Sequence, residues 1–112
     1  MYTLTLKHHF SSAHQLTNAY TKACNDYMHG HNWEVQVTIK TPKLINGMVI
    51  DFTKIKETIN KLDHKTLNEI LDFEPTAENI AKYLHQEISK LREDIIVKIK
   101  LWETPNSSIE YQ

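Results

Sequence analysis

Two histidines separated by one residue form the strongest chemical signal in this chain of 112 residues. The tripeptide His29-Gly30-His31 opens a segment in which apolar and polar residues alternate, as they do in a half-buried β-strand. Residues i and i+2 of a strand point to the same side, so both imidazoles face one space, and the glycine between them leaves room for a small ligand. Paired imidazoles at this spacing are typical of a zinc site.

A third metal ligand is expected from the first strand. His14 continues the inward phase of Leu6 and Phe10, and antiparallel pairing would place it beside the start of the second strand. Catalytic zinc takes three protein ligands and a water molecule. We therefore predict that zinc binds His14, His29 and His31. The alternative interpretation is that these histidines are polar residues at strand ends that cap backbone groups.

The sole cysteine, Cys24, lies in a polar stretch of residues 15–28, and four residues separate it from His29. A thiolate beside a bound cation has a lowered pKa and serves as a nucleophile or a base. Cys24 could instead be a fourth zinc ligand, which would close the site and indicate a structural metal, or a small buried apolar residue. A single cysteine forms no internal disulfide, so a reducing, cytoplasmic setting is expected.

Two carboxylates, Asp63 and Glu103, are further candidate functional residues. Asp63 precedes His64 at the end of an expected helix, and such a pair offers a general acid or base. The alternative is that His64 has no catalytic role, because a histidine at a helix C-terminus interacts favourably with the helix dipole. Glu103 shares the inward phase of Ile99 and Leu101, where a carboxylate is costly unless it is paired. We expect Glu103 to recognise adjacent N–H donors of a ligand, or to be solvated if its strand ends one residue earlier.

The periodicity of apolar residues predicts the elements that position these side chains. Four strands are expected: residues 2–14, 31–40, 95–103 and a short one around Ile109. Asp51 and Thr76 are candidate N-caps of two amphipathic helices. The residues expected to face the core are Phe52, Ile55, Ile59 and Leu62 in the first helix and Ile80, Leu84, Ile88 and Leu91 in the second. The order β-β-α-α-β-β predicts one α+β domain over residues 1–112, with an antiparallel four-stranded sheet packed on two helices.

Composition and charge disfavour several classes of partner. The 13 Lys+Arg against 14 Asp+Glu leave a formal net charge of -1, which provides no global attraction for nucleic acid or anionic membranes. No apolar run approaches the roughly 20 residues of a membrane span, and no secretory signal is visible.

The four strands leave exposed sheet edges, which proteins usually cover by pairing with another chain, so we expect a homo-oligomer.

Six short blocks make the chain resemble the 6-pyruvoyltetrahydropterin synthase / 6-carboxytetrahydropterin synthase family over nearly its whole length. The blocks are Phe10-Ser11-Ser12-Ala13-His14, His29-Gly30-His31-Asn32, Val49-Ile50-Asp51-Phe52, Leu62-Asp63-His64, Pro75-Thr76-Ala77-Glu78-Asn79 and Glu103-Thr104-Pro105. The resemblance implies the tunnelling fold (T-fold), in which the sheets of three subunits join into an intersubunit barrel and two trimers stack as a hexamer.

The resemblance also implies roles for the residues singled out above. The residues that match the zinc ligands are His14, His29 and His31. Cys24 matches the catalytic thiol, and Asp63 and His64 match the partners that complete a catalytic triad across a subunit interface. Glu103 matches the carboxylate that anchors the pterin ring through its 2-amino and N3 groups. Thr76 matches a position near the pterin pocket, although a helix-capping role explains it equally well.

The implied substrate is 7,8-dihydroneopterin triphosphate, and two products compete within the family. The short chain and compact loop between Cys24 and His29 favour the synthase that forms 6-carboxy-5,6,7,8-tetrahydropterin, acetaldehyde and triphosphate for queuosine and other 7-deazapurines. The alternative is the 6-pyruvoyltetrahydropterin synthase of the biopterin route. Three intervening residues are expected in the carboxy branch and five in the pyruvoyl branch, whereas this chain has four. A non-catalytic zinc-binding oligomer is the hypothesis from another class.

Overall fold

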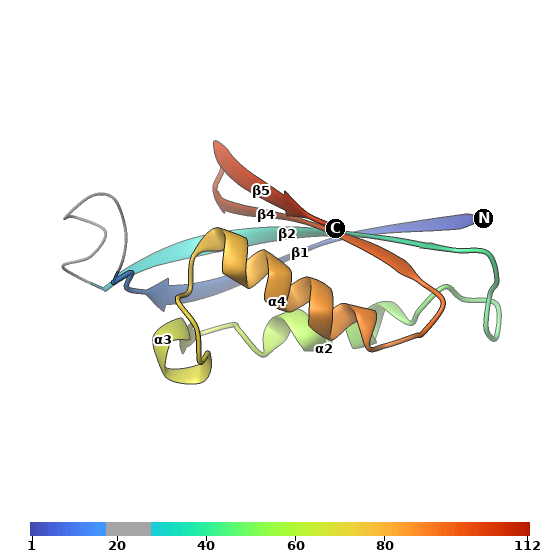
Figure 1. Cartoon of the computed structure of the whole chain (residues 1–112), viewed down its shortest axis with the longest axis horizontal. Helices are drawn as coiled ribbons and strands as arrows, with labels where there is room; N and C mark the ends of the chain where they lie inside the picture. Colours follow the sequence, from blue (N-terminus) through green and yellow to red (C-terminus); the bar gives the residue numbers. More distant parts are fainter. Residues whose placement is uncertain (18–27) are drawn as a thin grey trace.

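A computed structural model describes residues 1–17 and 28–112 as a mixed sheet with helices packed on one face (Figure 1). The strands are β1 (Tyr2–His14), β2 (His29–Thr41), β3 (Lys65–Thr66), β4 (Ile96–Thr104) and β5 (Ser107–Tyr111). The helices are α2 (Phe52–Asn60), α3 (Leu67–Ile70) and α4 (Ala77–Ser89). The sheet order is β3-β1-β2-β4-β5. The α+β class and the antiparallel order of the four longer strands are therefore confirmed.

The β1–β2 hairpin determines where the histidines meet. Every residue of β1 has a partner on β2, from Tyr2 opposite Thr41 to His14 opposite His29. Because one face of β1 carries the apolar residues, the register is strongly specified: a slip by one residue would expose them all. The predicted antiparallel pairing is confirmed, and it places the end of β1 beside the start of β2.

A fifth, two-residue strand was missing from the sequence prediction. β3 runs parallel to β1 and pairs with it at Ser12 and Ala13. His64, just before β3, has a φ of 55°, in the left-handed region, and its backbone N–H donates to the Ser11 carbonyl at 2.7 Å. This residue turns the chain alongside β1. A strand of two residues has no measurable alternation, so periodicity was unable to predict it.

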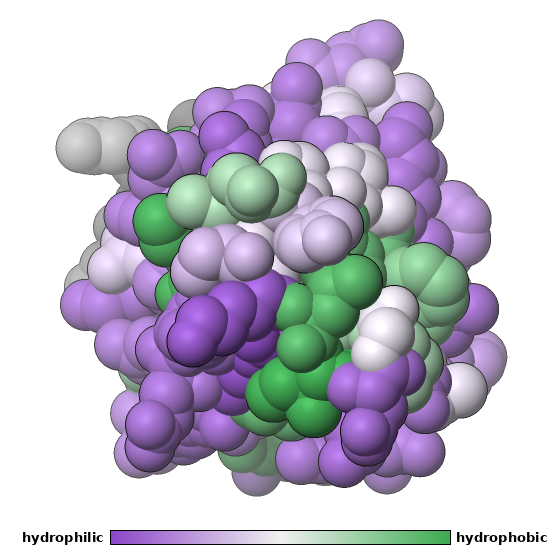
Figure 2. Space-filling view, turned by 90° about the vertical axis from the view of Figure 1, so that its right-hand side faces the viewer, coloured by the Kyte–Doolittle hydropathy of each residue, from purple (hydrophilic) through white to green (hydrophobic). Residues whose placement is uncertain are grey.

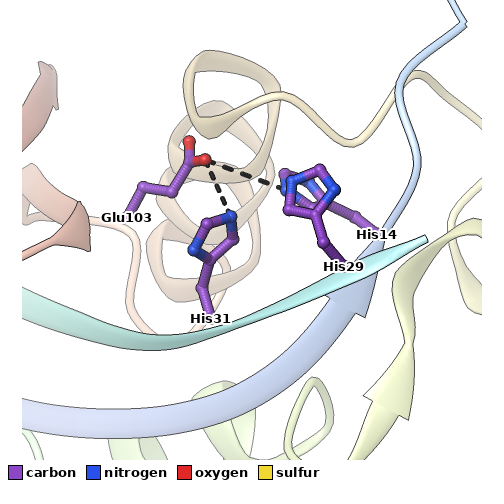
Figure 3. Close-up of side chains that lie close together, drawn as sticks. All are labelled: His14, His29, His31 and Glu103. Carbon is purple, nitrogen blue, oxygen red and sulfur yellow. Dashed lines mark ion pairs between the residues drawn. The ribbon is translucent and has the colours of Figure 1, made fainter. Parts of the chain in front are cut away.

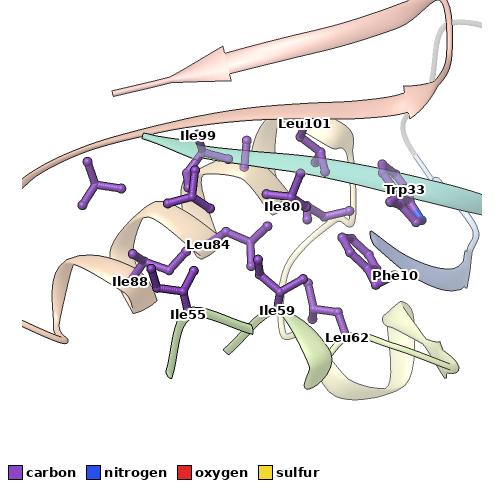
Figure 4. Packing of buried hydrophobic residues seen from close by; sticks show 14 of the residues in the cluster. Phe10, Trp33, Ile55, Ile59, Leu62, Ile80, Leu84, Ile88, Ile99 and Leu101 are labelled. Carbon is purple, nitrogen blue, oxygen red and sulfur yellow. The ribbon is translucent and has the colours of Figure 1, made fainter. Parts of the chain in front are cut away.

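The core lies between the sheet and helices α2 and α4 (Figure 4). The inward side chains of β2 and the apolar stripe of α4 are fully buried, as expected. They are Trp33, Val35, Val37 and Ile39 on the strand and Ile80, Leu84 and Ile88 on the helix. Phe52 is a correction, because its side chain is 54% exposed. It stands at the first position of α2 and borders a surface hollow rather than the core.

Both predicted helix caps are present. The Asp51 carboxylate accepts a hydrogen bond from the Thr53 backbone N–H at 2.9 Å, and the Thr76 hydroxyl accepts one from the Asn79 N–H at 3.1 Å. These side chains satisfy backbone donors that the first turn of a helix leaves unpaired. Hydrogen bonds from Thr53 also lower the pKa of Asp51.

Replacing Leu84 with alanine tests the packing of α4 on the sheet. The substitution is expected to lower the free energy of unfolding by about 2–5 kcal/mol, because it removes buried methyl groups and leaves a cavity. Urea denaturation measures the change. The matched control is Lys82→Ala on the exposed face of the same helix, expected to stay within about 0.5 kcal/mol of the parent. Equal effects of the two substitutions would contradict this packing.

Apolar side chains gather on the surface at the end of the molecule where β1 begins (Figure 2). They border a hollow of about 580 Å³, and they include Tyr2, Leu44, Met48 and Phe52.

β5 and most of β1 form the two edges of the sheet, since β3 covers β1 only at its end. Among the described residues, no helix is long and apolar enough to span a membrane.

Candidate metal centre

His14, His29, His31 and Glu103 meet where three strands of the sheet come together (Figure 3). β1 supplies the first residue, β2 the next two, and β4 the last. One donor atom from each side chain lies within 4.8 Å of the donor atoms of the other three. The structure thus brings together the three histidines predicted as zinc ligands and adds a carboxylate that had been assigned a different role.

The protonation of His14 follows from its second ring nitrogen. Nδ1 lies 2.7 Å from the Pro75 carbonyl oxygen, which is only an acceptor, so Nδ1 carries the hydrogen. A neutral His14 therefore turns the lone pair of Nε2 towards the other three donors. Metal-binding histidines are held in this way by a carbonyl or carboxylate on the second nitrogen. The ring is fully buried, which holds it in this orientation.

The cluster contains buried acceptors that face one another. Nε2 of His14 and Nε2 of His31 lie 3.9 and 2.9 Å from Oε1 of Glu103. Within residues 1–17 and 28–112, neither nitrogen has a hydrogen-bond partner, because even the shorter contact lacks hydrogen-bond geometry. The lone pair of His14 Nε2 and the Glu103 carboxylate repel each other in this partly buried cluster unless a cation lies between them. This donor set fits a divalent cation, and imidazole with carboxylate suits zinc.

The environment of His31 favours the neutral, ligating form of its ring. Burial lowers its pKa below the usual value, and the neighbouring rings of His14 and His29 lower it further, against the opposing effect of the Glu103 carboxylate. Only a neutral imidazole has a lone pair to offer a metal.

Glu103 reaches the cluster from an irregularity in the β4–β5 ladder. The register shifts between Trp102, which pairs with Ser108, and Thr104, which pairs with Ser107. Glu103 is the residue passed over, and such a bulge redirects a side chain. Its side chain is 32% exposed and faces the imidazoles. The strand continues to Thr104, so the alternative in which it ends before Glu103 is wrong.

Asp63 and His64 are not part of the four-residue cluster. The Asp63 carboxylate accepts a hydrogen bond from the Ser11 backbone N–H at 2.9 Å, and its second oxygen lies 3.5 Å from Nε2 of His64. The His64 side chain is 84% exposed and borders a hollow of about 400 Å³ that His31 and Asn32 also line. The pair is thus preassembled but faces outward, and its catalytic role stays a prediction.

Two further predicted residues differ in how far the structure describes them. Cys24 lies outside the described residues, so its position relative to the cluster stays a prediction. Thr76 caps α4, as its capping interpretation required, and its proximity to a pterin stays a prediction. Sequence reasoning missed Pro75 as a functional residue. It acts through its backbone carbonyl, and a carbonyl is present at every position, so no side-chain signal was available.

Comparisons with known proteins agree with this geometry. The family model described as 6-pyruvoyl tetrahydropterin synthase matches residues 3–112. The dihydroneopterin monophosphate aldolase of Pyrococcus furiosus is 35% identical over 91 residues, covering 76% of this chain and 78% of the relative. The 6-carboxy-5,6,7,8-tetrahydropterin synthase of Haemophilus influenzae is 30% identical, covering 100% and 99%. The solved structure of Caenorhabditis elegans 6-pyruvoyl tetrahydropterin synthase superposes with a TM-score of 0.77 at 25% identity, covering 99% and 94%.

Proposed function

The chain belongs to the 6-pyruvoyl tetrahydropterin synthase family, and from this premise we propose that it is a zinc-dependent 6-carboxy-5,6,7,8-tetrahydropterin synthase. It converts 7,8-dihydroneopterin triphosphate to 6-carboxytetrahydropterin, acetaldehyde and triphosphate, in the route to queuosine. The observation that carries the proposal is the convergence of three imidazoles and Glu103 in one cluster. Relatives of both names match at about 30% identity, so the carboxy product rests on the short chain and the compact loop between Cys24 and His29.

The three histidines would hold the zinc ion. When bound, the ion would supply Lewis-acid polarisation of a substrate side-chain hydroxyl, which acidifies the adjacent C–H bond. The Pro75 carbonyl holds the His14 ring through Nδ1, which leaves Nε2 available as a ligand atom. Glu103 accepts hydrogen bonds from the 2-amino and N3 groups of the pterin ring, which orients the side chain of the substrate towards the cluster.

Proton transfer is assigned to Cys24, Asp63 and His64. Asp63 lies beside the His64 ring, with a carboxylate oxygen 3.5 Å from Nε2, where it orients the imidazole. The exposure of the His64 side chain supports a triad completed across a subunit interface, since a partner chain is able to reach it. The free edges of β1 and β5 support a homo-oligomer in which sheets join into a barrel, with a hexamer as the proposed assembly.

Product identification tests the proposed reaction. Zinc-loaded protein is incubated with 7,8-dihydroneopterin triphosphate, and the products are identified by mass spectrometry. We expect 6-carboxytetrahydropterin together with acetaldehyde. A 6-pyruvoyltetrahydropterin product would move the protein to the biopterin route. Unchanged substrate, with one zinc ion per chain, would contradict catalysis on this substrate and favour a zinc-binding oligomer.

The identity with the Pyrococcus furiosus aldolase supports a second candidate, cleavage of a dihydroneopterin monophosphate. The same cluster suits this chemistry, because polarising a side-chain hydroxyl also promotes carbon–carbon cleavage. The competing substrate is therefore assayed in parallel, as 7,8-dihydroneopterin monophosphate under identical conditions. A kcat/KM for the monophosphate above that for the triphosphate would replace the synthase with an aldolase.

A further inference from the structure

We propose that Glu103 is a displaceable fourth ligand of the metal centre. Its carboxylate completes the coordination of the cation until a ligand with adjacent N–H donors withdraws it. The ligation depends only on donor atoms of this chain, whereas the withdrawal by a pterin ring rests on the proposed function.

Distances favour ligation by Glu103. Zinc–nitrogen and zinc–oxygen bonds of about 2.0–2.2 Å in a tetrahedral site place neighbouring donors about 3.3–3.5 Å apart. Oε1 of Glu103 lies 2.9 Å from Nε2 of His31 and 3.9 Å from Nε2 of His14. These two distances lie on either side of the tetrahedral value, so a small movement of the carboxylate satisfies both. The carboxylate thus lies close to the distances that a fourth ligand requires from these two nitrogens.

Electrostatics also favour a ligand rather than a hydrogen-bonded carboxylate. Nε2 of a neutral His14 carries a lone pair, because Nδ1 donates to the Pro75 carbonyl. Two acceptors, this nitrogen and Oε1 of Glu103, face each other in a site where the imidazole is fully buried. A shared cation turns this repulsion into two favourable contacts.

Glu103 is held loosely enough to leave. No N–H or O–H group among the described residues donates a hydrogen bond to its carboxylate, and the imidazoles of His14 and His31 are its ion-pair partners there. Its side chain is 32% exposed, and the backbone ladder is broken at its position. The other three donors belong to β1 and β2, which pair along their whole length. Glu103 is therefore the donor of the four that can turn away while the site remains intact.

The two roles of Glu103 exclude each other. Recognition of two adjacent N–H groups requires both carboxylate oxygens to point towards the ligand ring, so the carboxylate turns away from the cation when it is engaged in this way. Ring binding therefore opens a coordination position at the moment when the substrate side chain arrives. By linkage, the cation and a bare pterin ring compete for Glu103, and each weakens the binding of the other by the same factor.

Zinc affinity measured by competition with a chromophoric chelator tests the ligation. Glu103→Gln keeps the shape of the side chain and removes its charge, and we expect its zinc Kd to rise at least tenfold. The matched control is Glu110→Gln, an exposed carboxylate on β5 that lies 3.9 Å from Lys100, expected to stay within twofold of the parent. Zinc binding by Glu103→Gln as tight as in the parent would overturn the ligation.

The affinity for pterin without a 6-substituent tests the displacement, measured by fluorescence on the parent protein with and without zinc. We expect zinc to weaken pterin binding at least fivefold, in the range of ordinary coupling between sites. Unchanged or tighter binding with zinc, or no pterin binding at all, would overturn the displacement. Neither measurement needs turnover. If this inference is wrong and the proposed function is right, the protein forms product but its zinc Kd does not change in Glu103→Gln. If the proposed function is wrong and this inference is right, no product forms, but Glu103→Gln still weakens zinc binding and zinc still weakens pterin binding.

Discussion

Replacing His31 with alanine is expected to weaken zinc binding at least a hundredfold, which corresponds to about 2.8 kcal/mol or more. His31 supplies one of the three imidazoles, and its buried Nε2 atom has no hydrogen-bond partner in the part of the chain that the structure describes. Its side chain is 18% exposed and is not part of the apolar core, so the fold is expected to survive the substitution. Chelator competition and the zinc content of the purified protein measure the effect.

His9→Ala is the matched control for this prediction. His9 lies on the same hairpin but is exposed, and its side chain points to the opposite face of the sheet from His14. Its substitution is expected to leave zinc affinity within twofold of the parent. Stoichiometric, tight zinc binding by the His31→Ala protein would contradict the proposed centre. A similar loss in both variants would indicate damage to the hairpin rather than removal of a ligand.

Replacing Cys24 with alanine is expected to reduce kcat at least a hundredfold while zinc stays bound. A thiol that moves protons in the reaction contributes at this scale, and it makes no contribution to holding the ion. Steady-state product formation, zinc content and thermal unfolding are measured on the same preparation. These three readouts separate a catalytic thiol from a structural ligand.

A structural role for Cys24 would have the opposite signature. Loss of zinc together with a lower unfolding temperature would mean that the thiol closes the site, and the protein would then be a zinc-binding oligomer without catalysis. Full activity in the Cys24→Ala protein would contradict both roles. Four residues separate Cys24 from His29, rather than three or five, and this substitution tests whether the thiol is catalytic at that spacing.

The composition of the metal centre was predictable because each contributing pattern is local. Alternation of apolar residues identified the strands, and the period of two placed His29 and His31 on one side. The inward phase of the first strand and antiparallel pairing added His14. Asp51 and Thr76 were recognisable as caps, because a cap depends on a side chain and the two or three residues after it.

The tertiary structure alone decided how these residues work together. The Pro75 carbonyl reaches His14 across 61 positions of sequence, and a backbone carbonyl has no sequence signature. The Glu103 carboxylate, which the pattern assigned to a ligand ring, lies 2.9 Å from Nε2 of His31. His64 has a left-handed backbone where the chain turns into β3, and the Asp63–His64 pair is not part of that cluster. Periodicity reports the face on which a side chain lies, whereas the distances between faces depend on how distant segments pack, and these contacts set the chemistry of the site.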